Sequence, residues 1–553
     1  MNIFNSKRPL AKKQLNFSVV LSALVLLFVF SFSNAEAKNK AENDFKVIAY
    51  HVDLRVQVMP MPTLKALATE VADLGFNTIL MEWEATYPYK QHSIISNKYA
   101  YTRAEVEDFI KHSEGLGLDV IPLQQNFGHS EYILMHERYA YLRSFIRKYR
   151  KDYGQVDPTQ LDQAKELFTE LFTDMLSTHN SQYVHIGGDE TRILDCARCK
   201  IAWGKDGEEL GKSKLYVNYM KMIAEIVIAQ GKTPLLWADM ILAHPEAIAD
   251  MPKDVIWIDW NYGWAFDRFG ENPVDIIKKY DLTFWGAPAI RSGPDDYHVT
   301  KWSKHMNNQA DYIPYARDAG FEGMVLTSWS TSGVYGYDWF NSDEVVEIFP
   351  KRQVYPHAYP NDGFRMNVKA FIAAINQEKS FVPKDFAEQY AQERFGLSAQ
   401  QSENLWAILK SSTLYEKVPI GSIPFSGIEG LTDKERHVSE SLKAVRKLQS
   451  QLRKIVPQKN QQEFSHYQMQ VDFREFYLSF RQIQDLVQSS GFNEKERVKA
   501  VNQLEHLLAR ADKLNERFEA LFSGTLYDSD IETLNQYRNK KIKYLHQRLT
   551  KSK

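Results

Sequence analysis

The chain has 553 residues, of which 44% are hydrophobic and 25% are charged, a composition typical of a globular protein and unlike that of a disordered or fibrous one. Its formal net charge of −2 gives no support to nucleic-acid binding, because such proteins carry a strongly basic surface. The two cysteines, Cys196 and Cys199, exclude a disulfide-dense scaffold.

Residues 1–37 have the three parts of a secretory signal peptide. Lys7, Arg8, Lys12 and Lys13 form a basic start, 19–32 is an apolar run, and Ala35-Glu36-Ala37 matches an A-x-A cleavage site. An uncleaved anchor is disfavoured because the run is shorter than the roughly 20 residues that span a bilayer. We therefore expect export to the periplasm or the medium, with no stable membrane anchor after cleavage.

From residue 45 to about 335, short β-rich runs alternate with amphipathic stretches of helical spacing. The expected strands are 47–50, 78–81, 119–123, 183–186, 234–237, 255–258, 282–285 and 324–327. The expected helices include 63–74, 102–116, 159–178 and 213–229. Eight such strands predict an α/β fold, a (β/α)8 TIM barrel over residues 38–380, with its active site past the carboxyl ends of the strands.

From about residue 380 the composition changes, and strand-like runs nearly disappear. The segments 431–456, 461–489 and 493–522 read as long amphipathic helices. We expect an α-helical C-terminal domain over 381–553. A helical bundle packed against the barrel is favoured over a module that binds a partner or substrate.

The sequence His185-Ile186-Gly187-Gly188-Asp189-Glu190 follows the expected fourth strand directly. Successive side chains at a strand end point in different directions, so the two adjacent carboxylates can take different roles. The two glycines let a substrate approach the backbone. Close like charges also keep one carboxyl protonated, as a general acid requires. This arrangement is typical of a glycosidase, whereas the tetrapeptide alone would be an ordinary solvated turn.

The motif resembles the H-x-G-G-D-E signature of glycoside hydrolase family 20, the β-N-acetylhexosaminidases, whose fold is a (β/α)8 barrel. The resemblance implies that Glu190 is the general acid and base, and that Asp189 orients the substrate's 2-acetamido group. That group attacks the anomeric carbon and forms an oxazolinium intermediate, so the route is retaining and substrate-assisted. It requires neither a cofactor nor a metal.

The resemblance covers roughly residues 45–335. The segments His51-Val52-Asp53-Leu54-Arg55, Met81-Glu82-Trp83-Glu84 and 121–131 look like the hexosaminidase D branch of the family.

Further candidates for substrate binding fall at the expected strand ends. His129 would contact the sugar or the acid pair, and indoles there can wall a sugar pocket. Asp53, Arg55, Glu82 and Glu84 either hold sugar hydroxyls or form an ion-pair layer at the barrel mouth. The remaining candidates are Trp237, Asp239, Trp260, Tyr262, Trp285 and Trp329.

The chain departs from the family pattern in three places. The tyrosine that closes the acetamido pocket in many members is replaced by Phe284-Trp285-Gly286, which leaves Tyr262, Tyr335 or Tyr337 as candidates. Arg55 matches the family's sugar-anchoring arginine only loosely. Cys196 and Cys199 follow the acid pair closely and form either a short disulfide or free thiols, since a zinc site would need two more ligands.

Three functions compete on this reading. The first is an exported, exo-acting β-N-acetylhexosaminidase that removes terminal GlcNAc or GalNAc from oligosaccharides or glycoconjugates. The second is a catalytically silent carbohydrate-binding protein on the same scaffold, against which the intact Asp189 and Glu190 argue. The third is a metal-dependent hydrolase of the amidohydrolase kind, which would need an H-x-H pair where this chain has His51-Val52-Asp53.

Overall fold

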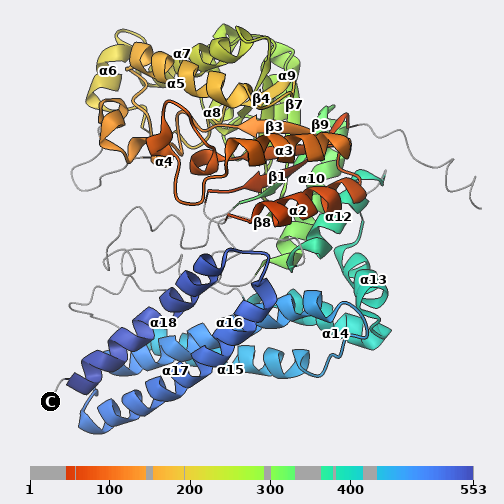
Figure 1. Ribbon diagram of the computed structural model, residues 1–553, viewed down its shortest axis with the longest axis vertical. Helices are drawn as coiled ribbons and strands as arrows, with labels where there is room; N and C mark the ends of the chain where they lie inside the picture. Colours follow the sequence, from red (N-terminus) through yellow and green to blue (C-terminus); the bar gives the residue numbers. More distant parts are fainter. Residues whose placement is uncertain are drawn as a thin grey trace, which may run out of the picture. The chain divides into compact units, whose positions relative to one another are not determined.

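Eight parallel strands close into a barrel in the computed structural model of the chain (Figure 1). The order around the ring is β1 to β7 and then β9, and β9 pairs with β1 to complete it. The expected TIM barrel is confirmed. The strands are β1 (Val47–Asp53), β2 (Thr78–Glu82), β3 (Asp119–Leu123), β4 (Tyr183–His185), β5 (Thr233–Trp237), β6 (Ile256–Trp260), β7 (Thr283–Ala287) and β9 (Gly323–Ser328).

The structure describes residues 45–55, 58–144, 154–191, 193–291, 300–329, 363–377, 381–414 and 432–551, without the side chains of 432–437 and 537. The expected signal peptide at 1–37 and the candidates Tyr335 and Tyr337 lie outside these ranges.

Helices connect the strands and cover the outside of the barrel (Figure 1). The buried residues of α5, Ala164, Leu167, Phe168, Leu171, Phe172 and Met175, recur three or four positions apart and form one apolar face. The helices of this region are α2 (Met61–Asp73), α3 (Arg103–Gly115), α4 (Glu131–Leu134), α5 (Leu161–Leu176), α6 (Ala197–Trp203), α7 (Glu208–Ile228), α8 (Asp239–Ala243), α9 (Pro273–Tyr280) and α10 (Trp302–Asp318), with short 3₁₀ segments at Glu84–Thr86, Ser93–Ile95, Glu137–Leu142 and Pro245–Asp250.

Element ends differ from the expected bounds by a few residues, for local reasons. Thr102 stays outside α3 because its side chain accepts a hydrogen bond from the Glu105 backbone and caps the helix. Strand β1 continues to Asp53, since its register with β2 runs on to Glu82. A short strand that was not predicted, β8 (Ala289–Arg291), pairs with the end of β9.

Every second strand residue points into the barrel, as the pleat requires. A separate apolar cluster fills this interior and includes Ala49, Leu80, Ile121, Leu235 and Val325. Continuing the same alternation toward the carboxyl ends brings polar and aromatic side chains to the barrel mouth.

Beyond the barrel the described chain is helical, as expected, and α15 to α18 run beside one another in sequence order (Figure 1). The three long helices predicted there are present, and a fourth, α18, was missed because its sequence is rich in charged and amide residues. The helices are α12 (Arg365–Ile375), α13 (Pro383–Phe395), α14 (Ala399–Leu409), α15 (Thr432–Leu452), α16 (Gln461–Gln488), α17 (Glu494–Phe522) and α18 (Asp528–Lys551), with a 3₁₀ turn at Ser412–Leu414. None of the helices in the described ranges is long and apolar enough to cross a bilayer.

Specific polar contacts join these helices to the barrel helices. Tyr99 donates to the Asp530 carboxylate at 2.9 Å, and Thr63 donates to the Gly524 carbonyl oxygen at 2.9 Å. Arg365 on α12 contacts Glu70 of α2 at 2.5 Å and Glu463 of α16 at 2.7 Å. Glu463 is buried and also accepts from Arg394 at 2.8 Å and from the Tyr390 hydroxyl.

We expect Glu463→Gln to lower the free energy of unfolding by about 3 kcal/mol, because it leaves buried donors without their carboxylate. Urea unfolding followed by circular dichroism measures the change. The matched control is Glu403→Gln, whose ion pair with Lys384 is solvent-exposed, and for which we expect less than about 1 kcal/mol. Equal losses in the two variants would contradict the role given to Glu463.

Candidate active site

The acid pair sits on a tight turn that begins where β4 ends. Gly187 and Gly188 have φ values of 62° and 94°, which glycine adopts without strain. A Cβ on Gly187 would lie 2.2 Å from the side-chain oxygen of Gln125, so a larger residue would have to displace that side chain. The turn leaves the Asp189 side chain 8% exposed and the Glu190 side chain 36% exposed. Asp189 is therefore the inner carboxylate and Glu190 the outer one.

Three residues other than glycine at this mouth have left-handed backbone conformations. Glu84, His129 and Glu190 have φ values of 45°, 51° and 50°, and they follow β2, β3 and β4 respectively. Such conformations cost free energy and persist where the surroundings enforce them, often at functional sites. Their grouping at three neighbouring strand ends supports a functional site there.

His129 contacts both members of the acid pair. Its Nε2 atom lies 3.2 Å from Asp189 Oδ2 and 3.4 Å from Glu190 Oε2. Burial by itself lowers the pKa of His129, but the charge of Asp189 and the hydrogen bonds to both carboxylates raise it well above its ordinary value. The imidazole therefore holds its proton more tightly than a free imidazole does, and its positive charge offsets the repulsion between the two acids.

Asp239, which begins α8 after β5, holds the backbone of the outer acid. Its Oδ2 atom accepts a hydrogen bond from the Glu190 backbone N–H at 3.0 Å. Burial and the charge of Asp189 raise the pKa of the Asp239 carboxyl to about 7. This residue thus fixes the position of Glu190 by a contact with its main chain.

An aromatic wall stands beside the acids. The rings of Trp237 and Trp329 are 5.6 Å apart, and Trp329 Nε1 donates to the Tyr262 hydroxyl at 2.5 Å. Trp260 lies at the end of β6, with its ring 5.2 Å from that of Tyr262. The predicted residues Trp237, Trp260, Tyr262 and Trp329 therefore come together at one side of the mouth.

Several buried polar atoms around this wall have no hydrogen-bond partner among the described residues. They include Asp189 Oδ1, His185 Nε2 and Trp237 Nε1. Leaving a buried polar atom unpaired costs free energy, so a polar ligand that pairs with these atoms would bind favourably. The set offers both acceptors and donors.

The four charged residues predicted at the rim form a buried network. Arg55 contacts Asp53 Oδ2 at 3.1 Å, and His51 Nε2 lies 3.0 Å from Glu82 Oε2. Burial by itself raises the pKa of Glu82, but Arg55 and the hydrogen bond with His51 lower it to about 2. Burial raises the pKa of Glu84 well above its usual range, and Oε1 of this residue has no partner among the described residues. Part of the network is thus an ion-pair layer, and a role in holding sugar hydroxyls stays a prediction.

Trp285 belongs to the apolar cluster of the barrel interior, together with Trp237 and Trp329. It is 2% exposed, and its ring is 5.4 Å from that of Tyr183, the first residue of β4. A Cβ on Gly323, the first residue of β9, would meet the same indole at 2.8 Å. Trp285 therefore packs in the barrel interior toward the opposite end of these strands, and its predicted part in binding remains untested.

Two polar residues at the mouth were not predicted as site residues. His51 also contacts the Trp329 ring at 4.6 Å, and Gln125 donates to Glu82 at 3.2 Å. Both occupy inward positions that the strand alternation could have revealed, two residues before Asp53 and two after Leu123.

Cys196 and Cys199 form a disulfide, the first of the two alternatives considered. Cys196 caps the start of α6, and Cys199 is buried beside the Ile193 carbonyl oxygen. The disulfide braces the segment that follows the acid pair.

Residues 55–278 match the model of the glycosyl hydrolase family 20 catalytic domain. These residues therefore form a family 20 catalytic domain. The domain makes the chain a glycoside hydrolase, and its relatives are named β-hexosaminidases.

Relatives of the family 20 chain include two proteins named Hexosaminidase D. The one from Bos taurus is 28% identical over 343 residues, which is 58% of this chain and 94% of the relative. The one from Homo sapiens is 29% identical over 307 residues, which is 52% of this chain and 60% of the relative. Among solved structures, a β-N-acetylhexosaminidase from Bacteroides fragilis matches with a TM-score of 0.45 and 16% identity over 66% of this chain and 72% of that one.

We expect Asp239→Asn to change how stability depends on pH. The carboxyl titrates near pH 4 when unfolded and at about 7 when folded, so its contribution to wild-type stability falls as pH rises from about 4 to about 7. The stability of the variant relative to wild type should therefore rise across this window and level off above it. Urea unfolding at intervals from pH 4 to 8 measures the difference, with the exposed Asp254→Asn as control. A difference that does not vary with pH would contradict the assigned titration.

Proposed function

We propose that this family 20 hydrolase is an exo-acting β-N-acetylhexosaminidase that cleaves terminal β-linked GlcNAc or GalNAc from oligosaccharides or glycoconjugates. The observation that carries the proposal is the contact of one histidine, His129, with both Asp189 and Glu190 beside an aromatic wall. A buried inner carboxylate and an exposed outer one suit two different tasks at one glycosidic bond.

Glu190 is the proposed general acid, because its exposed carboxyl can reach the oxygen that leaves with the aglycone. The acetamido oxygen of the substrate attacks the anomeric carbon, the bond to the leaving oxygen breaks, and Glu190 gives that oxygen its proton. Water then attacks the anomeric carbon of the oxazolinium ion, Glu190 takes up a proton, and the acetamido group is restored. The configuration at the anomeric carbon is retained.

Asp189 is proposed to hold the acetamido N–H through Oδ1, which has no partner among the described residues. Its negative charge would stabilise the positive charge that develops on the nitrogen of the oxazolinium ion. His129 contributes by holding the neighbouring oxygen, Oδ2, at 3.2 Å.

Tyr262 is the candidate among the described residues for the donor to the acetamido oxygen. Burial raises the pKa of its hydroxyl, which therefore keeps its proton. The hydroxyl accepts a hydrogen bond from Trp329 Nε1, which fixes its position. Trp237 and Trp329 would pack against the acetamido methyl group and the sugar ring.

Export is part of the proposal. It rests on the signal-peptide pattern of residues 1–37, and the disulfide between Cys196 and Cys199 supports it, because disulfides persist in oxidising compartments. Fractionation of the native host, with N-terminal sequencing of the mature protein, tests it. A cytoplasmic protein that begins at Met1 would contradict it.

We expect Glu190→Gln to lower kcat by about 10²-fold to 10⁴-fold on substrates whose leaving group needs a proton. The loss should be smaller on aryl glycosides with acidic leaving groups, such as p-nitrophenyl β-GlcNAc and β-GalNAc. Steady-state kinetics across a series of leaving groups measures this. A loss that is equal for every leaving group would contradict acid catalysis by Glu190.

Asp189→Asn should lower kcat on acetamido sugars strongly, because the oxazolinium ion loses its counter-charge. A thiazoline analogue of the intermediate should also inhibit the wild-type enzyme strongly and the variant weakly. Unchanged turnover in the variant, or equal cleavage of sugars that lack the acetamido group, would exclude substrate assistance. Tight binding of an N-acetylhexosamine with no turnover by the wild-type chain would favour the silent carbohydrate-binding alternative.

A further inference from the structure

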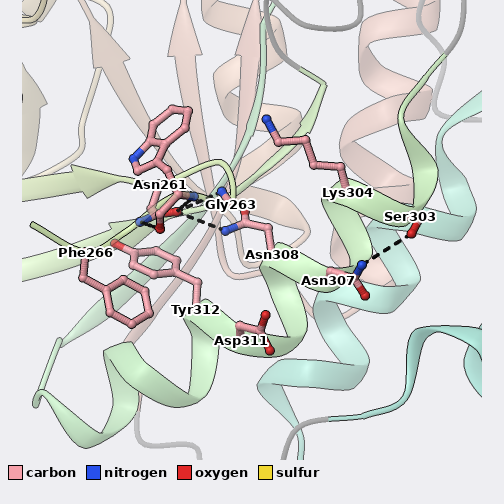
Figure 2. A pocket seen from close by; sticks show the side chains of 10 residues that line it. Asn261, Gly263, Phe266, Ser303, Lys304, Asn307, Asn308, Asp311 and Tyr312 are labelled. Atoms are coloured by element: carbon pink, nitrogen blue, oxygen red, sulfur yellow. Dashed lines mark hydrogen bonds between the residues drawn. The ribbon is translucent and has the colours of Figure 1, made fainter. Parts of the chain in front are cut away.

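A second cavity lies between the loop that follows β6 and the helix α10. It has a volume of about 520 Å³, within the range of sites that bind small ligands. Figure 2 shows residues from 261–266 on one side facing residues from 303–312 of α10 on the other. None of the acids or indoles assigned above to the active site lines it.

The loop after β6 contributes residues both to the active site and to the second cavity. Tyr262 belongs to the interior cluster that contains Trp237 and Trp329, on the side of the acid pair. Asn261 and Trp264 line the second cavity instead. The Trp264 ring packs 5.2 Å from the Tyr262 ring and 5.5 Å from the Trp260 ring. The cavity is therefore distinct from the active site but shares a wall with it.

Hydrogen bonds within the turn hold this wall in place. Asn261 Oδ1 accepts from the Gly263 backbone N–H at 2.9 Å, and from Asn308 Nδ2 at 3.3 Å (Figure 2). Asn261 Nδ2 donates to the Trp264 carbonyl oxygen at 3.2 Å. A contact between residues 47 positions apart thus ties the loop to α10 and shapes the cavity in the free protein.

Asn308 leaves a buried acceptor at the cavity. The residue is 4% exposed, and its Oδ1 atom has no hydrogen-bond partner among the described residues. An unpaired amide oxygen in this environment gains free energy when a ligand donates a hydrogen bond to it. This is an observation independent of the cavity's shape, and it indicates a ligand with hydroxyl or amide donors.

The other residues that line the cavity indicate the chemical class of its ligand. Trp264 is half-buried and offers an aromatic surface, while Ser303 and Asn307 offer neutral polar groups. Lys304 and Asp311 are the charged residues of the lining, and their charges cancel. A neutral ligand with apolar C–H faces and many hydroxyl groups fits such walls better than an anion or an apolar molecule does.

We propose that this cavity is a second saccharide-binding site, which takes a neutral oligosaccharide while the active site is occupied. The choice of a saccharide rests on the proposed function, because the oligosaccharide substrates proposed above are ligands of this kind. A bound saccharide at the shared wall would keep a polymeric or clustered substrate near the active site.

The test is isothermal titration calorimetry of the wild-type enzyme with a β-1,4-linked tetramer of N-acetylglucosamine. The active site is first saturated with the thiazoline inhibitor, and its occupancy is checked by loss of activity. We expect one equivalent of tetramer to bind under these conditions. No binding would overturn the proposal.

Substitutions test whether the tetramer binds in this cavity. Trp264→Ala should weaken it about tenfold or more, and Asn307→Ala, an exposed substitution, should weaken it severalfold with turnover of the aryl glycosides unchanged. The control is Phe269→Ala, which removes a ring packed 4.8 Å from Trp260 and 6.3 Å from Trp264 but does not line the cavity. Wild-type affinity in both cavity variants, or an equal loss in the control, would overturn the proposal.

The result is separable from the proposed function. If the thiazoline fails to inhibit, the mechanism is wrong, and the tetramer is then titrated into the Glu190→Gln enzyme. Loss of binding in the Trp264→Ala, Glu190→Gln double variant would still support the cavity, whereas unchanged binding would overturn it.

Discussion

Repulsion among carboxylates is the constraint around which the active site is built. Asp189 and Glu190 both contact His129, and Asp239 accepts a hydrogen bond from the Glu190 backbone. Each of the three carboxylates is at least partly buried. His129 offsets the charge of the first two, and the Glu190 backbone N–H compensates Asp239. Without these partners the carboxylates would repel one another, and the inner and outer acids would not keep the separate positions that the structure gives them.

The barrel supplies the rigidity that this arrangement needs. The left-handed residues Glu84, His129 and Glu190 follow three adjacent strands, β2, β3 and β4. The hydrogen-bonded strands fix the backbone before each of them, which is how such strained conformations persist. Trp329, after the last strand, then links separate parts of the mouth. It contacts His51, Trp237 and Tyr262, and the Arg55 guanidinium lies 5.6 Å from its ring. Closure of the ring by β1 and β9 is what brings Arg55 and Trp329 together.

Among the described residues, the polar contacts of the C-terminal helices are with the outer layer of the barrel and not with the acid pair. Their polar contacts reach α2, Tyr99 before α3, and α10 near both of its ends, and the buried Glu463 gathers donors from α12 and α13. These helices therefore support the outer layer of the barrel, and one helix of that layer, α10, also lines the second cavity together with the loop after β6.

The order of elements and the place of the acid pair could be read from the sequence. Period-two strand patterns, helical spacing and the Gly187-Gly188 turn are local properties, and each depends only on nearby residues. The same reasoning placed Trp237, Tyr262 and Trp329 at strand ends. Contacts between distant residues were decided only by the tertiary structure. The hydrogen bond from Glu190 to Asp239 spans 49 positions, and the contact of Asn261 with Asn308 spans 47. Such contacts depend on strand register and barrel closure, and for this reason the sequence could not show that Trp285 packs inside the barrel or that α10 completes a second cavity.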